Sequence, residues 1–207
     1  MKNGLIIYMN YRKTLDEILL KNGGFITYYQ ARIANINPSL FKKFIIDKSL
    51  IKQAPGFYSE DGWEIDLYFL FQYRFPKYIF SFFSSLHLLN LLELNEDIIE
   101  VTGPTNYRPT ELNNPGVVFH TSIPKTYELG ITTIKTRYGN TVKAYNLERT
   151  ICDFLKNKNK FSNEIYLEII KILKKNYQLI NFDLLKKYGE CLNIKNRIVE
   201  LDIILRI

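Results

Sequence analysis

Two pairs of carboxylates spaced two residues apart are the side chains most suited to catalysis by a metal ion. Glu64 and Asp66 form one pair, and Glu200 and Asp202 form the other. Two carboxylates on one face of a strand can hold Mg²⁺ for phosphoryl transfer. The second pair lies in a stretch with helical periodicity, where side chains at i and i+2 diverge. A metal-dependent nuclease or nucleotidyltransferase therefore remains the alternative hypothesis, and it requires Glu64 and Asp66 to converge with a third carboxylate.

The histidines and cysteines show no spacing typical of catalysis or metal binding. His87 and His120 have no Cys, Ser or carboxylate motif beside them, so we expect a core or surface role for each. Cys152 and Cys191 form no C-x-x-C, and we expect both to be small core residues in a reducing cytoplasm. The sequence has no P-loop and no G-x-S-x-G motif. It therefore predicts no catalytic residue, no metal site and no cofactor.

Positive charge is concentrated at the two ends of the chain. The whole sequence carries a formal net charge of +7, divided into +4 for residues 1–62, −2 for residues 63–140 and +5 for residues 141–207. Because phosphate neutralisation gives affinity that does not depend on sequence, this excess favours a polyanionic partner. The many lysines, asparagines and isoleucines also match the bias of AT-rich coding DNA, which would carry no functional meaning.

The stretch over residues 27–58 predicts two short helices joined by a tight turn. Thr27 can cap the first helix. Pro38 favours the start of the second helix because it has no N–H to lose there, and Asn37 is then its N-cap. That helix is expected to run to about Ser49. Two helices joined by three or four residues are typical of a helix-turn-helix, which places its second helix in the major groove.

The outer face of that second helix is polar, and a β-wing is expected after it. Leu40, Phe41, Phe44 and Ile45 would face the core, whereas Ser39, Lys42, Lys43 and Asp47 would face outward. Residues 50–52 and 57–59 are expected to form two strands about a Pro-Gly turn. A Lys-Lys pair is also typical of a solvated helix face, so the pattern alone leaves both interpretations open. A further helix is predicted over residues 11–22, before this motif. Together these elements would form an N-terminal domain that spans residues 1–60.

A mixed domain is predicted for residues 61–207. The expected helices are 66–73, 81–92, 147–157, 163–175, 182–192 and 194–204, and the expected strands are 98–102, 117–121, 130–136 and 141–144. Arg74, Pro76 and Lys77 interrupt the aromatic stretch 65–92, so neither half has the ~20 apolar residues that span a membrane. We therefore predict an α+β fold without membrane association, in which a winged helix-turn-helix precedes a mixed α/β domain that ends in a helical bundle.

One segment has the features of a well-capped helix. Asn146 can cap it, and Glu148 lies in the first turn, where the helix dipole favours an acid. Arg149 and Asp153 are i,i+4 neighbours that can form an ion pair. Taken by itself, the segment indicates a structural helix, and nothing in its residue pattern indicates catalysis.

Residues 145–153, YNLERTICD, resemble the signature that opens the helical part of AbiEi-type antitoxins. These are the transcriptional-regulator halves of type IV toxin–antitoxin abortive-infection systems. The resemblance extends over nearly the whole chain. The sequence PGFY at 55–58 stands where that family has a wing ending in Arg-Gly-x-Tyr, and 79–91 resembles its Ser-rich buried helix. The sequence VTGP at 101–104 resembles the strand and turn that follow it.

Three positions depart from the pattern of that family. Ser49 stands where the family often has Gly after the recognition helix, and Pro55 replaces a basic residue that is common in the wing. Phe82 and Phe83 replace a common His-Glu, so any chemistry performed by that pair in relatives is not available here. The loss of the His-Glu pair favours a binding role over an enzymatic one, and the loss of the basic wing residue leaves Lys52 to contact phosphate there.

The resemblance implies a non-enzymatic cytoplasmic protein of phage defence with two tasks. Its N-terminal domain would bind double-stranded DNA at inverted repeats in its own promoter and repress the operon. Its C-terminal domain would counter a nucleotidyltransferase-like toxin without forming a stable complex. The implied DNA contacts are Ser39, Lys42 and Lys43 on the recognition helix, Asn37 at its start, Thr27, Tyr28 and Gln30 on the preceding helix, and Lys52 and Gln53 in the wing. A basic surface of the C-terminal domain would comprise Lys156, Lys158, Lys160, Lys171, Lys174, Lys175, Lys186 and Lys187.

Overall fold

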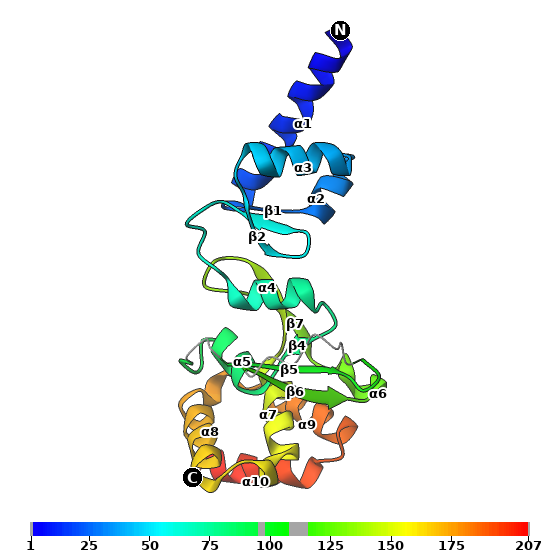
Figure 1. Ribbon diagram of the computed structural model, residues 1–207. Coiled ribbons are helices and arrows are strands. Elements are labelled where there is room, and N and C mark those ends of the chain that lie inside the picture. The colour runs from blue at the N-terminus through cyan, green and yellow to red at the C-terminus, as the bar shows by residue number, and fades with distance from the viewer. Residues whose placement is uncertain (1, 95–97, 108–115, 207) are drawn as a thin grey trace. The chain divides into compact units, whose positions relative to one another are not determined.

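The computed structural model describes residues 2–94, 98–107 and 116–206, with only the helical backbone for residues 2–10. The chain divides into two compact units, Met1–Ile65 and Asp66–Ile207 (Figure 1). The division falls shortly after the polar turn at residues 60–62, where the composition of the sequence changes. In the described part of the chain, no helix has both the length and the apolar character needed to cross a membrane.

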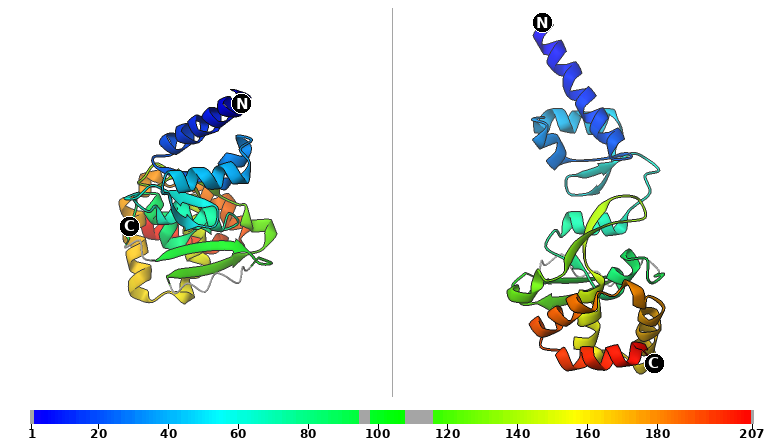
Figure 2. Two further views of the ribbon diagram at one scale, coloured as in Figure 1. Left: turned by 45° about the horizontal axis from the view of Figure 1, so that its top comes forward. Right: turned by 180° about the vertical axis from the view of Figure 1, so that it is seen from behind.

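The N-terminal unit combines helices with a small antiparallel sheet, seen from two further sides in Figure 2. Its elements are α1 (Lys2–Lys21), β1 (Phe25–Thr27), α2 (Tyr28–Ile33), α3 (Pro38–Asp47), β2 (Ile51–Ala54) and β3 (Phe57–Ser59). The strand order is β1-β3-β2, and both pairings are antiparallel. Leu15, Ile26, Phe41 and Phe44 are buried together in its core. Helix α1 begins well before the predicted Tyr11, because no proline stops the helix upstream of the apolar stripe.

The C-terminal unit is a mixed sheet with helices, in agreement with the predicted α+β class. Its sheet and central elements are α4 (Leu67–Arg74), β4 (Ile79–Phe80), α5 (Phe82–Leu88), β5 (Ile99–Pro104), β6 (Val117–Ser122), α6 (Pro124–Tyr127), β7 (Ile131–Lys135), β8 (Thr141–Tyr145) and α7 (Leu147–Lys156). It ends with α8 (Asn163–Lys175), α9 (Phe182–Cys191) and α10 (Lys195–Arg206), and short 3-10 helices at Lys158–Lys160 and Tyr177–Leu179. Strand β4 and helix α6 were not predicted from the sequence, because elements of two and four residues carry no periodic signal.

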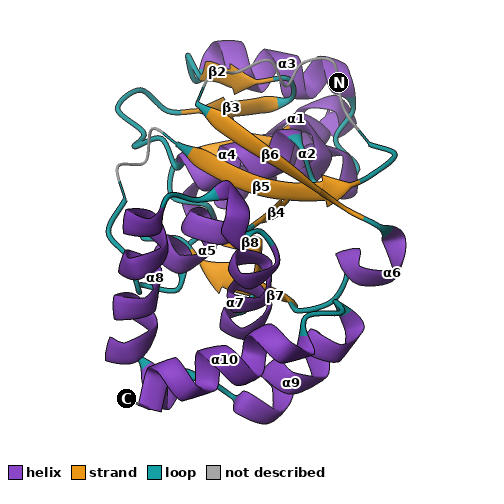
Figure 3. Cartoon of the chain, turned by 90° about the horizontal axis from the view of Figure 1, so that it is seen from below, coloured by secondary structure: helices purple, strands orange, loops and turns teal. Residues whose placement is uncertain are grey.

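The short strand β4 joins two halves of the five-stranded sheet, whose order is β6-β5-β4-β8-β7 (Figure 3). Phe80 of β4 pairs antiparallel with Val101 of β5 and parallel with Ala144 of β8. Strands β5 and β6 run parallel, whereas β7 and β8 form an antiparallel hairpin. Because all three paired residues at this junction are buried, the two halves share one core.

Helices cover both faces of this sheet. Helix α4 packs on one face, where Tyr68, Phe71 and Phe80 belong to one apolar cluster (Figure 1). Helices α5 and α7 lie on the other face, and α8, α9 and α10 surround α7 in a second cluster that includes Ile151 and Leu185. Helix α7 is therefore the central helix of the unit, and it carries the signature sequence.

Buried serines attach α5 to its neighbours. Ser84 Oγ accepts a hydrogen bond from the backbone N–H of Glu100 (2.8 Å), and Ser85 Oγ donates to the carbonyl of Tyr145 (2.6 Å). Ser81 Oγ accepts from the hydroxyl of Thr102 (2.9 Å). A buried polar group is stable only when it is hydrogen-bonded, so these three bonds explain how a serine-rich helix can lie inside the fold.

Candidate nucleic-acid interface and the signature helix

The start of α2 is fixed by a reciprocal capping box. Gln30 N–H donates to Thr27 Oγ1 (3.2 Å), and Thr27 N–H donates to Gln30 Oε1 (2.9 Å). The predicted N-cap is therefore confirmed. Thr27 is buried, and both side chains are engaged within the fold. The hydrogen-bonding atoms of both side chains therefore set the start of α2, and their contact with DNA stays a prediction.

Helix α3 has the predicted N-cap, and the face predicted to be polar is exposed to solvent. Asn37 Oδ1 accepts from Leu40 N–H (2.9 Å), and Pro38 occupies the first turn. Phe41 is buried, whereas Ser39, Lys42 and Lys43 are exposed. The helix ends at Asp47, and Ser49 after it has a left-handed φ of 53°. That conformation is the one for which glycine is the usual residue, so a serine here keeps the turn at some cost in strain.

The predicted wing corresponds to a short antiparallel hairpin of β2 and β3. Gly56 takes a φ of 72° in its turn. Lys52 is exposed on β2, whereas Gln53 is half-buried and its Nε2 donates to Ser59 Oγ (2.9 Å). Gln53 therefore closes the hairpin, and Lys52 is the predicted wing residue that faces solvent.

Six of the nine predicted DNA-contacting residues are exposed in the N-terminal unit. They are Tyr28, Asn37, Ser39, Lys42, Lys43 and Lys52. The ring of Tyr28 lies 5.8 Å from that of Phe41, centroid to centroid, so α2 and α3 meet at the base of this surface. The structure thus brings the exposed candidates from three consecutive elements into one small unit.

The predicted basic residues of the C-terminal unit are all exposed, and they are distributed over several helices. They lie on α7, the 3-10 helix at Lys158–Lys160, α8 and α9. Helices α8 and α9 are on different sides of α7 in Figures 1 and 3. The eight lysines are therefore carried by several parts of the helical bundle, and a single basic surface made of all of them stays a prediction.

The signature helix buries its ion pair. Arg149 Nε lies 3.0 Å from Asp153 Oδ1, with 2% and 9% of the two side chains exposed. Arg149 Nη1 donates to the carbonyls of Leu129 (2.9 Å) and Thr126, and the guanidinium carbon lies 4.2 Å from the ring centroid of Tyr145. The sequence predicted the pair but not its burial. Arg149 ties α7 to the chain that connects β6 to β7.

The other two residues of the signature also hold α7 in place. Asn146 Oδ1 accepts from Arg149 N–H (3.0 Å), which confirms the predicted cap. Glu148 is buried, and its Oε1 accepts from the backbone N–H of Asn181 (2.9 Å) just before α9. Glu148 therefore orients a second helix, in addition to its place in the first turn of α7.

Burial perturbs the titration of two groups around this ion pair. Burial raises the pKa of the Asp153 carboxyl above its ordinary value, and the neighbouring Arg149 opposes that rise. Burial also raises the pKa of Tyr145 strongly. The phenol of Tyr145 donates to the carbonyl of Tyr127 (2.7 Å), which requires its protonated form.

His120 has a carboxylate partner that the sequence did not indicate. Its Nε2 lies 2.6 Å from Glu100 Oε1, and Glu100 Oε2 accepts from the backbone N–H of Phe83 (3.1 Å). Strands β5 and β6 run side by side, so residues twenty positions apart meet there. Nothing in the sequence indicated this pair, because only the register of the two strands reveals it. His87 stacks on Tyr68 at 5.6 Å.

The aspartates of the two carboxylate pairs considered for a metal site have partners within the fold. Asp66 Oδ1 accepts from Phe69 N–H (3.0 Å), and Asp66 Oδ2 accepts from Thr136 Oγ1 (2.5 Å) and Asn140 Nδ2 (2.9 Å). In the second pair, Asp202 Oδ1 lies 2.8 Å from Arg206 Nε. Within the ranges that the structure describes, no three His, Cys, Asp or Glu side chains are grouped closely enough to hold a metal ion.

The two cysteines lie in different environments. Cys152 is buried, as predicted, and burial raises the pKa of its thiol to about 12. Cys191 is exposed at the end of α9, so the prediction of a core role for it is wrong. Only thiolates react readily with disulfide reagents, so the two thiols should differ strongly in reactivity.

We expect Ellman's reagent at pH 8 to modify one thiol of the folded protein rapidly, and the second only after denaturation. The fast thiol is Cys191, because Cys152 is shielded and protonated at this pH. The release of thionitrobenzoate measures both phases. A Cys191→Ser variant should lose the fast phase; two fast equivalents in the unaltered protein would show that Cys152 is accessible.

Comparisons with known proteins identify a fold but no family. No protein-family model matches the chain, and no curated protein matches it. The chain is similar to the crystal structure of the RV2827C protein from Mycobacterium tuberculosis, with a TM-score of 0.54 and 11% sequence identity. The similarity covers 95% of this chain and 81% of that one. At this identity it shows a shared fold over most of both chains.

Proposed function

We propose that this chain is a DNA-binding autorepressor and antitoxin of the AbiEi type. The observation that carries the proposal is the capped α2-turn-α3 segment, which presents Ser39, Lys42 and Lys43 on the solvent side of α3. The adjoining sheet adds a wing with an exposed Lys52. This arrangement suits docking of α3 in a major groove.

The chemistry of this surface supports two kinds of contact. Lys42, Lys43 and Lys52 would neutralise phosphates and so provide affinity with a strong dependence on salt. Asn37 Oδ1 already caps α3, so the Asn37 Nδ2 group would be the part of the amide that donates to a base edge in the major groove. Phosphate contacts position the protein and base contacts select the sequence. The expected target is an inverted repeat in the promoter of its own operon.

The antitoxin half of the proposal rests on the C-terminal unit. Its support is the YNLERTICD segment, of which Asn146, Glu148, Arg149 and Asp153 all hold α7 within the unit. We propose that this unit counters a nucleotidyltransferase-like toxin without forming a stable complex. No specific observation favours the alternative of a metal-dependent nuclease, because both oxygens of Asp66 already accept hydrogen bonds within the fold.

Salt-dependent DNA binding tests the repressor half. Lys42→Ala is expected to lower affinity for the protein's own upstream DNA severalfold at low salt. It should also reduce the slope of log K against log salt by about one unit, because one phosphate contact is lost. Fluorescence anisotropy with a scrambled duplex of equal length measures specificity in the same titration.

Lys13 on α1 provides the matched control, because it is an exposed lysine outside the proposed interface. Lys13→Ala should leave both affinity and slope close to those of the unaltered protein. Equal, weak binding to both duplexes, or identical losses in the two variants, would contradict a specific interface on α3.

A further inference from the structure

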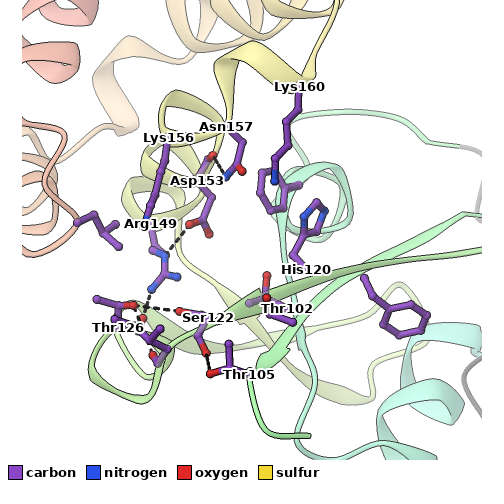
Figure 4. A pocket seen from close by; sticks show the side chains of 15 residues that line it. Thr102, Thr105, His120, Ser122, Thr126, Arg149, Asp153, Lys156, Asn157 and Lys160 are labelled. Atoms are coloured by element: carbon purple, nitrogen blue, oxygen red, sulfur yellow. Dashed lines mark hydrogen bonds and ion pairs between the residues drawn. The ribbon is translucent and has the colours of Figure 1, made fainter. Parts of the chain in front are cut away.

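Two hollows in the described part of the chain differ in chemical character. The cavity of about 380 Å³ among β6, α6 and α7 of the C-terminal unit is polar, and side chains along its wall bond to one another (Figure 4). Arg149 pairs with Asp153, and Ser122 Oγ lies 3.0 Å from Thr126 Oγ1. A groove of about 530 Å³ in the N-terminal unit is instead mostly apolar, and it is lined along much of α3.

The walls of this groove come from three neighbouring parts of the N-terminal unit. Phe41 of α3 lines the groove but is itself buried, and the rings of Tyr28 and Tyr58 each lie 5.8 Å from the Phe41 ring, centroid to centroid. Ile45 lines it from α3, and Gly56 lines it from the turn between β2 and β3. Tyr28 N–H donates to the carbonyl of Gly56 (2.7 Å). The packed rings and this backbone bond therefore hold the groove in shape.

The edge of the groove along α3 combines an exposed isoleucine with a cation. Ile46 follows Lys42 by one helical turn, and both line the groove. Among the described residues of the lining, Lys42 alone carries a charge. The acidic residue of α3, Asp47, pairs with Arg12 of α1 and lies outside the lining. An apolar groove with a positively charged edge suits an apolar group that is carried on a polyanion.

Double-stranded DNA offers one such group to a helix in its major groove. Thymine presents its C5-methyl group there, whereas the other bases present hydrogen-bond donors and acceptors. Successive bases of a strand lie about 3.4 Å apart along the axis, so adjacent thymines place a row of methyl groups beside the helix. Because the groove is much larger than one methyl group, it has room for more than one member of such a row.

We infer that the groove between α3 and the β2–β3 hairpin receives the methyl groups of adjacent thymines in double-stranded DNA. The inference rests on the proposed function and adds the base that this surface selects. Tyr28, Ile45 and Ile46 would contact the methyl groups, and Lys42 would lie near a phosphate beside them. Each half of the inverted repeat would therefore contain at least two consecutive thymines next to α3.

Replacing thymine by deoxyuridine tests the inference, because the exchange removes the methyl groups and keeps the base pairs and the backbone charge. The protein's own upstream DNA is prepared with either base, and the full chain is titrated into each duplex by fluorescence anisotropy. One buried methyl group contributes about fourfold in affinity, so the deoxyuridine duplex should bind at least about tenfold more weakly. Sequence-specific binding that is equal for both duplexes would overturn this inference alone. Binding no tighter than to a scrambled thymine duplex would overturn the repressor proposal as well.

Two isoleucine variants locate the effect. Ile46→Ala should weaken binding of the thymine duplex and reduce its advantage over the deoxyuridine duplex to about threefold or less, because part of the groove wall is removed. Ile33 on α2 provides the matched control, since it is 63% exposed against 66% for Ile46 and lies outside the groove lining. Ile33→Ala should keep the full advantage. A loss caused by altered DNA shape would persist in Ile46→Ala, so equal ratios in the two variants would overturn the inference.

Discussion

Replacing Arg149 by alanine should destabilise the C-terminal unit by about 3–5 kcal/mol, the usual cost of removing one partner from a buried ion pair. The substitution leaves the Asp153 carboxylate buried without its cation, with only 9% of the side chain exposed. It also removes the donor to the carbonyls of Leu129 and Thr126. Each orphaned buried acceptor adds to the loss.

The single tryptophan makes this prediction specific to one unit. Trp63 lies in Met1–Ile65, where its ring is 5.6 Å from that of Phe25, so its fluorescence reports the N-terminal unit. Urea unfolding followed by far-UV circular dichroism reports helices of both units. Arg149→Ala should shift the circular dichroism transition to lower urea and leave the tryptophan transition nearly in place. A loss below about 1 kcal/mol would show that the buried pair contributes little beyond an exposed one.

A matched ion pair at the end of the chain provides the control. Asp202 and Arg206 are also an i,i+4 pair, with Nε 2.8 Å from Oδ1, but 64% of the arginine side chain is exposed. Solvent screens such a pair. Arg206→Ala should therefore leave the urea midpoint within experimental error. Both substitutions remove an arginine from an i,i+4 pair, so their contrast measures what the burial of Arg149 and its bonds to the two carbonyls add to such a pair.

The effect of Arg149→Ala should depend on pH in a defined direction. Burial already raises the folded-state pKa of Asp153, and removal of Arg149 takes away the charge that opposes this rise. An acid whose folded pKa lies above its unfolded value, about 3.9 for aspartate, stabilises the fold below that unfolded value. It loses this contribution as the pH rises through the folded pKa. The deficit of the variant should thus be smaller near pH 4 than at neutral pH.

Local features of the fold followed from local sequence. The caps at Thr27, Asn37 and Asn146 were predictable, because a capping side chain acts on backbone only a few residues away. The Arg149–Asp153 pair was predictable from the spacing of one helix turn. These interactions need no knowledge of the tertiary structure.

Features that depend on strand register did not follow from the sequence. His120 meets Glu100 only because β5 and β6 are parallel neighbours. The two-residue strand β4, through which Phe80 joins the halves of the sheet, carries no periodicity of its own. Similarly, the exposure of Cys191 depends on which face of α9 the other helices cover. Each of these properties arises from partners far away in the chain.

Gly130 shows how closely the signature helix is packed, and its replacement is the second large effect that we expect. Gly130 has a φ of +80°, and a Cβ added there would lie 2.5 Å from Arg149 Cβ and 2.9 Å from Asn146 Oδ1. Its carbonyl accepts from Asn146 N–H (2.8 Å). The clash involves an atom next to the α7 backbone, so neither side can yield without disturbing the cap. Gly130→Ala should cost about 2–4 kcal/mol, from left-handed strain plus overpacking.

Gly139 isolates the first of these two causes, the strain of the left-handed backbone. It lies in the turn between β7 and β8 with a nearly equal φ of +83°, but an added Cβ would meet nothing within 4 Å. Gly139→Ala should therefore cost only the strain of the left-handed conformation, about 1–2 kcal/mol. Urea unfolding of both variants measures the difference. A larger loss for Gly130→Ala would assign the excess to contact with Arg149 and Asn146. Equal losses would mean that the start of α7 yields to an added methyl group, and that Gly130 is required there only for its φ.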